Sequence, residues 1–215
     1  MTEQEWLKIA DPMVMIDYLR TKSSDRKHLL YGSAECRRKW DWFSDDAVSV
    51  QTLDLAEKFA DGHVDRAHIE SASYALSNRG MTTITEFLVE LEGGSPAAAV
   101  AAAVISCVAN WALDNADREK VEEIIHIEEA LQVQLVHEVF GNPFRRVKLN
   151  RKLISSIALS LASSIYDERA YDRLPILADA LQESGVENED VLNHLRSIRS
   201  HVRGCWALDL VLGKK

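Results

Sequence analysis

The sequence has few of the features that mark secreted or membrane proteins. Its three cysteines, Cys36, Cys107 and Cys205, are far apart and none lies in a Cys-x-x-Cys pair, which excludes a dense disulfide framework. The longest apolar run, residues 97–109, is too short for a membrane span, which needs about 20 residues. The first residues, MTEQEWLKIAD, have no apolar core of the secretory type. We therefore expect a cytoplasmic protein with reduced thiols and no membrane contact.

Signals for β-strands are equally scarce, because no segment shows a convincing alternation of apolar and polar residues. Helix start and stop signals recur instead. Thr2 with Glu5 forms a capping-box pattern, and Asp11 before Pro12 is typical of a helix start. These patterns predict an all-α fold, a globular bundle of about ten to eleven helices. Solenoid-like stacking of helix pairs is the alternative, although no fixed-period repeat supports it.

Two long helices are predicted between residues 95 and 140. The alanine-rich run after Ser95–Pro96 favours a central helix that is buried on all sides. A long amphipathic helix is expected over 117–140, and later helices over about 151–166, 173–184, 189–198 and 201–212. The simplest organisation is one domain over residues 1–215. A subdivision into an acidic part, 1–140, and a C-terminal part, 141–215, is the alternative.

Charge is distributed unevenly along the chain. The net charge is -9, yet residues 141–215 carry 12 Lys and Arg against 9 Asp and Glu. An acidic chain is not a general binder of nucleic acids or anionic membranes, because both select positive surfaces. A cationic contact is therefore expected in the C-terminal part alone.

The change in charge coincides with an unusual stretch, GNPFRRVKLNRKL, at residues 141–153. Gly141 is a natural end for the preceding helix, and Asn142 before proline is held out of the helical conformation. A sharp turn of the chain, here called the corner, explains these residues. It does not explain the cluster of cations that follows them. We hypothesise a basic, partner-binding surface that also includes arginines from the last helices. Its predicted members are Arg145, Arg146, Lys148, Arg151, Lys152, Arg199 and Arg203.

An acidic protein surface is the predicted partner of these cations. The acidic N-terminal part of the same molecule is a second candidate of the same kind. Nucleic acid is less favoured, because no surface aromatic residues are interleaved with the cations to stack on bases.

Two groups of residues have spacings that suit metal ligands. In EEIIHIEE, Glu123 and Glu129 each lie three residues from His126, and Glu-x-x-His is the spacing of helical di-iron sites. Such a site needs a second pair, and the nearest match is Asp65-x-x-His68, which uses the shorter acid. A solvated acidic helix face is the simpler interpretation.

The second group is His201 and Cys205, one helical turn apart, which could share Zn²⁺ with His194. A structural zinc site takes four ligands, and no fourth lies nearby in the sequence. Cys205 also begins an apolar run, CWALDLVL, which favours a buried core thiol. The sequence therefore predicts no metal and no cofactor. Its five candidate ligands, should a metal be bound, are Glu123, His126, Glu129, His201 and Cys205.

Several segments resemble a large paralogous family of uncharacterised proteins in planctomycete bacteria. They are MTEQEWL, SDRKHLLYGSAECRRKW, GNPFRRV, IYDERAYDRLPILADALQESG and LNHLRSIRSHVRGCWALDLVLGKK. The resemblance covers both ends of the chain and is weaker over about 63–130. It implies an exchangeable accessory module. The family often has cysteines beside Cys36 and His194, where this chain has Glu35 and Leu195, so the resemblance gives little support to metal binding.

Motifs for nucleophilic or phosphate chemistry are missing, since the chain has no G-x-S-x-G, no glycine-rich phosphate loop and no H-E-x-x-H. We therefore interpret the protein as a non-catalytic interaction or regulatory module that docks through the basic corner. A metal-dependent helical enzyme with a Glu-x-x-His site is the first alternative. A nucleic-acid-associated regulator is the second. The sequence leaves the oligomeric state open.

Overall fold

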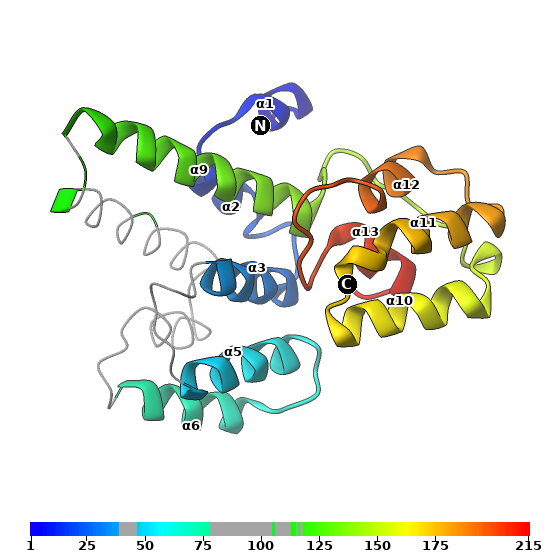
Figure 1. Ribbon diagram of the computed structural model, residues 1–215, viewed down its shortest axis with the longest axis horizontal. Coiled ribbons are helices and arrows are strands. Elements are labelled where there is room, and N and C mark those ends of the chain that lie inside the picture. The colour runs from blue at the N-terminus through cyan, green and yellow to red at the C-terminus, as the bar shows by residue number, and fades with distance from the viewer. Residues whose placement is uncertain (39–46, 78–104, 106–112, 115, 117) are drawn as a thin grey trace. The chain divides into compact units, whose positions relative to one another are not determined.

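The computed structural model of the chain describes residues 1–38, 47–77, 105, 113–114, 116 and 118–215. The described residues form ten α-helices, two short 3-10 helices and no strand, which confirms the all-α prediction (Figure 1). They contain no helix with the length and apolar character needed to cross a membrane. The chain divides into two compact units, Met1–His137 and Glu138–Lys215, here called unit 1 and unit 2.

Unit 1 begins with the capping signals read from the sequence. Thr2 and Glu5 form the capping box of α1, and the Asp11 carboxylate accepts the amide hydrogens of Met13 and Val14 at the start of α2. The described helices of this unit are α1 (Glu3–Lys8), α2 (Pro12–Leu19), α3 (Asp25–Arg38), α5 (Ala47–Ala60), α6 (Arg66–Ser77) and α9 (Arg118–Phe140) as far as His137. The alanine-rich segment after Ser95 lies almost entirely outside the described residues.

Buried charge is the most unusual feature of unit 1. Arg38 donates hydrogen bonds to Glu35 of its own helix and to Glu128 of α9, and both carboxylates are almost fully buried. Arg37 pairs in the same way with Asp54 and with the buried Glu57 of α5. Guanidinium groups with a fixed positive charge therefore balance the buried acids here.

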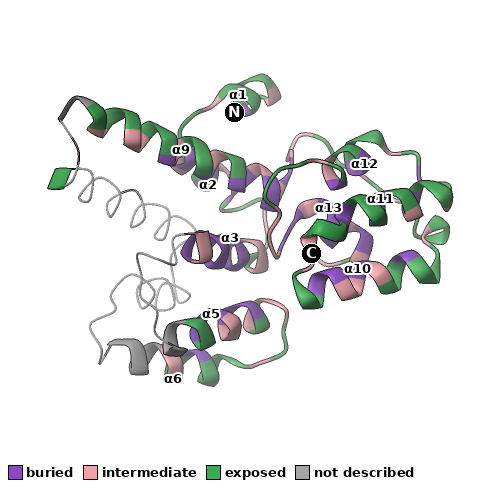
Figure 2. Cartoon of the chain, viewed as in Figure 1, coloured by how far each residue is buried: buried purple, intermediate pink, exposed green. Residues whose placement is uncertain are grey.

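Unit 2 packs four helices around one apolar core. Its elements after the end of α9 are η2 (Arg151–Leu153), α10 (Ser156–Glu168), η3 (Tyr171–Arg173), α11 (Leu174–Glu183), α12 (Glu189–Leu195) and α13 (Trp206–Leu212). Helix α10 contacts α11 and α13, and α12 contacts the same two helices. Their buried faces, purple in Figure 2, include Ile165, Tyr166, Leu177, Leu195 and Leu208.

Two predicted helices of unit 2 are wrong in their bounds. The helix expected over 151–166 is divided into η2 and α10, because Ser155 adopts an extended conformation and caps a new start. The helix expected over 201–212 begins only at Trp206, since Gly204 has φ +95° and ends any continuous helical path. His201 and Cys205 therefore lie on an irregular segment and not on one helical turn.

Candidate metal centre

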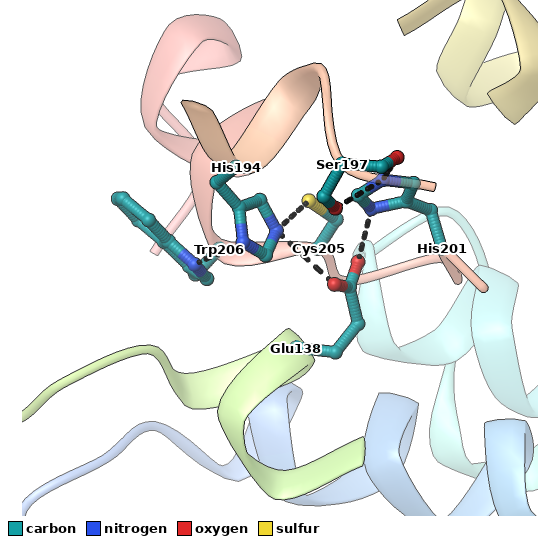
Figure 3. Close-up of polar contacts among 6 residues, drawn as sticks. All are labelled: Glu138, His194, Ser197, His201, Cys205 and Trp206. Atoms are coloured by element: carbon teal, nitrogen blue, oxygen red, sulfur yellow. Dashed lines mark hydrogen bonds and ion pairs between the residues drawn. The ribbon is translucent and has the colours of Figure 1, made fainter. Parts of the chain in front are cut away.

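Three parts of unit 2 supply the side chains of this site. Glu138 lies in the last turn of α9, which ends at Gly141 with φ +66°. His194 lies in the last turn of α12, and His201 lies in the segment that joins α12 to α13. Cys205 occupies the N-cap position of α13. The four donor groups face one another in Figure 3.

Short distances connect these groups. The two Glu138 carboxylate oxygens lie 3.1 Å from His194 Nε2 and 3.0 Å from His201 Nδ1. His194 Nε2 is also 3.2 Å from Cys205 Sγ. One donor atom from each of the four residues lies within 4.8 Å of all the others. Among the described residues, this is the one group of three or more His, Cys, Asp or Glu side chains with such a convergence.

These separations are close to those that tetrahedral zinc requires. Bonds of about 2.0 Å to nitrogen and oxygen and about 2.3 Å to sulfur place ligand atoms roughly 3.3–3.8 Å apart around the ion. The hydrogen-bonded pairs at 3.0–3.2 Å would move apart slightly, and the widest pairs would move together. Small side-chain adjustments are therefore enough to build a tetrahedral Glu/His/His/Cys site.

The site is shielded from solvent, which sets its electrostatics. The side chains of Glu138 and His201 are 5% and 4% exposed. Burial acts to raise the pKa of Glu138, but hydrogen bonds and charge interactions with His194 and His201 outweigh it and hold the pKa at about 2. Burial acts to lower the pKa of His201, but Glu138 outweighs it and the net pKa is raised.

Cys205 is a thiol in the absence of a cation. Burial, followed by the charge of Glu138, raises the pKa of Cys205 well above its ordinary value. A divalent cation bound beside the sulfur reverses this preference, because a coordinating thiol gives up its proton. Metal and protons therefore compete for the same donor atoms, as in other sites that contain cysteine and histidine.

The outer nitrogen atoms of the two histidines have different partners. His201 Nε2 lies 3.3 Å from both the carbonyl oxygen and the hydroxyl oxygen of Ser197, so both partners on this side of the ring belong to one residue. These partners leave Nδ1 to bind a metal, an arrangement that orients many histidine ligands. His194 Nδ1 instead lies 3.1 Å from Trp206 Nε1, which can only donate.

The structure brings together His201 and Cys205, two of the five ligand candidates from the sequence, with His194, which the sequence grouped with them, and it adds Glu138. Spacing along the sequence does not predict Glu138, because this residue lies far from the two histidines and the cysteine in the chain. One signal is present in the sequence: Glu138 follows Leu135 at helical spacing, which places a carboxylate on the face of α9 that carries the buried Leu135. A buried carboxylate without a partner is costly, and here the two histidines are its partners.

The other three ligand candidates lie in unit 1, on the solvent side of α9. The His126 side chain is 77% exposed, and its Nδ1 lies 3.0 Å from Glu129. Glu123 is exposed on the same helix. No third donor joins His126 and Glu129 in a metal-binding group among the described residues. Asp65 and His68 form a similar exposed pair elsewhere in unit 1.

Most of the predicted partner-binding cations are exposed in unit 2. The exposed members are Arg145, Arg146, Lys148, Arg151, Lys152 and Arg199. Arg203 differs, because it is half-buried with its guanidinium carbon 4.3 Å from the centre of the Tyr166 ring. The predicted corner has the expected local form: Gly141 is left-handed, and the Asn142 side chain accepts the Phe144 amide hydrogen.

Comparison with known proteins gave no match to any protein-family model, curated protein or solved structure. Functional conclusions therefore depend on the geometry of the site.

Proposed function

We propose that unit 2 is a zinc-binding helical module in which Glu138, His194, His201 and Cys205 hold one Zn²⁺. The observation that supports this proposal is the convergence of four different donor side chains, from three parts of the unit, within 4.8 Å. A carboxylate, two imidazoles and a thiol are all zinc ligands. Mg²⁺ and Ca²⁺ require oxygen ligands throughout and fit this set poorly.

The zinc would have a structural role. Four protein ligands complete a tetrahedral shell, whereas catalytic zinc keeps one position open for water or substrate. The low exposure of Glu138 and His201 also leaves little access for a substrate. Bound zinc would join the end of α9 to α12 and to the start of α13. Such a link adds the free energy of metal binding to the stability of a small unit.

Native mass spectrometry tests the proposal on untagged protein purified without chelators. We expect one zinc ion per chain, lost in His201→Ala. His126→Ala is the matched control, since it removes an exposed histidine from α9, and it should keep the metal. A folded wild-type chain that neither carries zinc nor takes up added Zn²⁺ would refute the zinc site. Zinc lost from His126→Ala but kept by His201→Ala would favour the Glu-x-x-His alternative.

A second function, docking to an acidic protein surface, is supported by the position of the ligands in the chain. Glu138 lies seven residues before Arg145, the first of the exposed cations of 145–152, and His194 and His201 flank Arg199. Zinc bound to these ligands would hold the two cationic segments of unit 2 in a fixed relation. A fixed array of cations supports electrostatic recognition better than a mobile one, because less entropy is lost on binding.

Binding of zinc-loaded protein to poly-L-glutamate and to duplex DNA, measured over a range of salt, tests this docking function. Arg145→Glu with Arg146→Glu should weaken binding to poly-L-glutamate by about tenfold or more, through lost attraction and added repulsion. Lys8→Glu with Arg20→Glu makes the same change of net charge on exposed residues of unit 1 and should have a smaller effect. Equal effects of both pairs would contradict docking through the basic corner. Stronger binding to DNA would favour the nucleic-acid alternative.

A further inference from the structure

The hydrogen bond between Trp206 and His194 fixes the position of a proton inside the candidate metal centre. The indole Nε1–H donates to His194 Nδ1 across 3.1 Å (Figure 3). The accepting nitrogen needs a free lone pair, so the imidazole proton resides on Nε2. That atom faces the Glu138 carboxylate at 3.1 Å and Cys205 Sγ at 3.2 Å. The proton therefore occupies the position on the ring through which His194 would bind a metal.

Zinc binding and this hydrogen bond exclude each other. A neutral histidine that binds zinc through Nε2 carries its proton on Nδ1. His194 would lose the proton on Nε2 and gain one on Nδ1. The ring would stay neutral. Two N–H groups would then point at each other across 3.1 Å. The indole or the imidazole must move before the zinc shell is complete.

The Trp206 ring packs against Gly141, which has no side chain to collide with it. A Cβ atom added at Gly141 would lie 3.0 Å from Trp206 Cγ, and the left-handed φ of Gly141 already disfavours other residues. The His194 ring lies against the indole with centroids 5.0 Å apart. The indole is thus in contact with a metal-ligand candidate and with the first residue of the segment that carries Arg145 and Arg146.

We propose that Trp206 sets the zinc affinity of this site by holding His194 in the tautomer that opposes metal binding. This inference rests on the proposed zinc function. In the metal-free protein Trp206 stabilises the Nε2–H tautomer. Zinc binding breaks the hydrogen bond and displaces the indole beside Gly141. The site is therefore weaker than its ligand set allows, and zinc exchanges more readily than from a fully pre-organised site.

The sign of one substitution distinguishes this role from simple packing. Trp206→Phe removes the donor and keeps an aromatic ring, so the Nδ1–H tautomer becomes available. Zinc affinity, measured by competition with a chromophoric chelator, should rise by about tenfold, the equivalent of one hydrogen bond. A residue that only supports the site would lower the affinity when replaced. Trp6→Phe is the matched control, because Trp6 packs edge-on against His137 in unit 1 and should leave the affinity unchanged.

A measurement on wild-type protein covers the case in which Trp206→Phe does not fold. Nitrogen NMR of the histidine rings distinguishes a protonated from an unprotonated Nδ1. We expect His194 Nδ1 to gain a proton on addition of Zn²⁺, with faster hydrogen exchange of the Trp206 indole N–H. If wild type binds zinc with the indole N–H unchanged, or Trp206→Phe binds equally or more weakly, this inference fails and the zinc site stands. If neither protein binds zinc, both fail.

Discussion

The two units balance buried carboxylates in different ways. In unit 1, Arg38 faces Glu35 and Glu128, and a guanidinium is charged at every pH that a protein tolerates. In unit 2, the Glu138 carboxylate faces His194, His201 and Cys205, groups whose protons a metal ion can replace. A buried acid in unit 1 thus has a permanent partner, and the one in unit 2 has exchangeable partners. Only the second arrangement can accept a metal ion in place of protons.

The largest expected contrast between the units is in their response to zinc. A ligand that binds only the folded state at a concentration a thousand times its Kd stabilises that state by about 4 kcal/mol. Calorimetry should show that EDTA lowers the melting temperature of unit 2 in wild type. Cys205→Ser should abolish this response. Cys36→Ser, which alters a buried thiol of unit 1, should keep it. An EDTA response that survives in Cys205→Ser would contradict the ligand role of the thiol.

The next effect belongs to unit 1 and should be independent of zinc. Arg38→Met leaves Glu35 and Glu128 buried without their shared cation, and loss of one partner of a buried ion pair costs about 3 kcal/mol. Urea unfolding followed by hydrogen exchange should place this loss in unit 1, equally with Zn²⁺ and with EDTA. Adding Glu35→Gln should recover part of it. A loss of stability that depends on zinc would contradict the independence of the Arg38 ion pairs from the metal site of unit 2.

Opposite pH trends should separate the units in EDTA. The raised pKa of His201 gives unit 2 stability that is fully present below its unfolded value of 6.5 and is lost as the pH rises through the folded value. The lowered pKa of Glu138, about 2, gives stability that is present above 4.5 and is lost as the pH falls towards 2. Metal-free unit 2 should therefore be most stable between about pH 4.5 and 6.5.

Unit 1 should behave differently in that window. Burial lowers the pKa of His28, so its contribution is present above pH 6.5 and is lost as the pH falls below it. Between pH 7.5 and 5.5, hydrogen-exchange protection, corrected for the intrinsic exchange rate at each pH, should therefore fall in unit 1 and rise in metal-free unit 2. Each trend changes the free energy of unfolding by about 1 kcal/mol per unit of pKa shift. Parallel trends would contradict the assignment of these charges, and His28→Gln should flatten the trend of unit 1 alone.

The smallest expected effect concerns an exposed pair of an acid and a histidine in unit 1. Asp65 and His68 lie 2.6 Å apart, closer than Glu138 and either histidine, but both side chains are more than half exposed. Water screens such a pair, so Asp65→Asn should leave the melting temperature and the zinc content unchanged. A measurable loss would mean that distance, and not burial, decides which of these pairs stabilises the protein.

The sequence predicted those parts of the molecule that depend on neighbours along the chain. The caps at Thr2 and Asp11 and the end of α9 at Gly141 follow from local chemistry and were read correctly. The spacing of His201 and Cys205 predicts one helical turn between them, but an irregular segment brings them together. Glu138 depends on tertiary packing, and no spacing rule connects it to His194.

The order of the ligands along the chain has a consequence for proteolysis. Glu138 precedes η2, α10, η3 and α11, whereas His194, His201 and Cys205 all follow them. With Zn²⁺ bound, these elements form a loop whose two ends are joined through the metal. A cut within the loop, for example between α10 and α11, would leave the two fragments connected by zinc. The fragments would separate only after a chelator removed the zinc. The bound metal would close this part of the chain as a disulfide does.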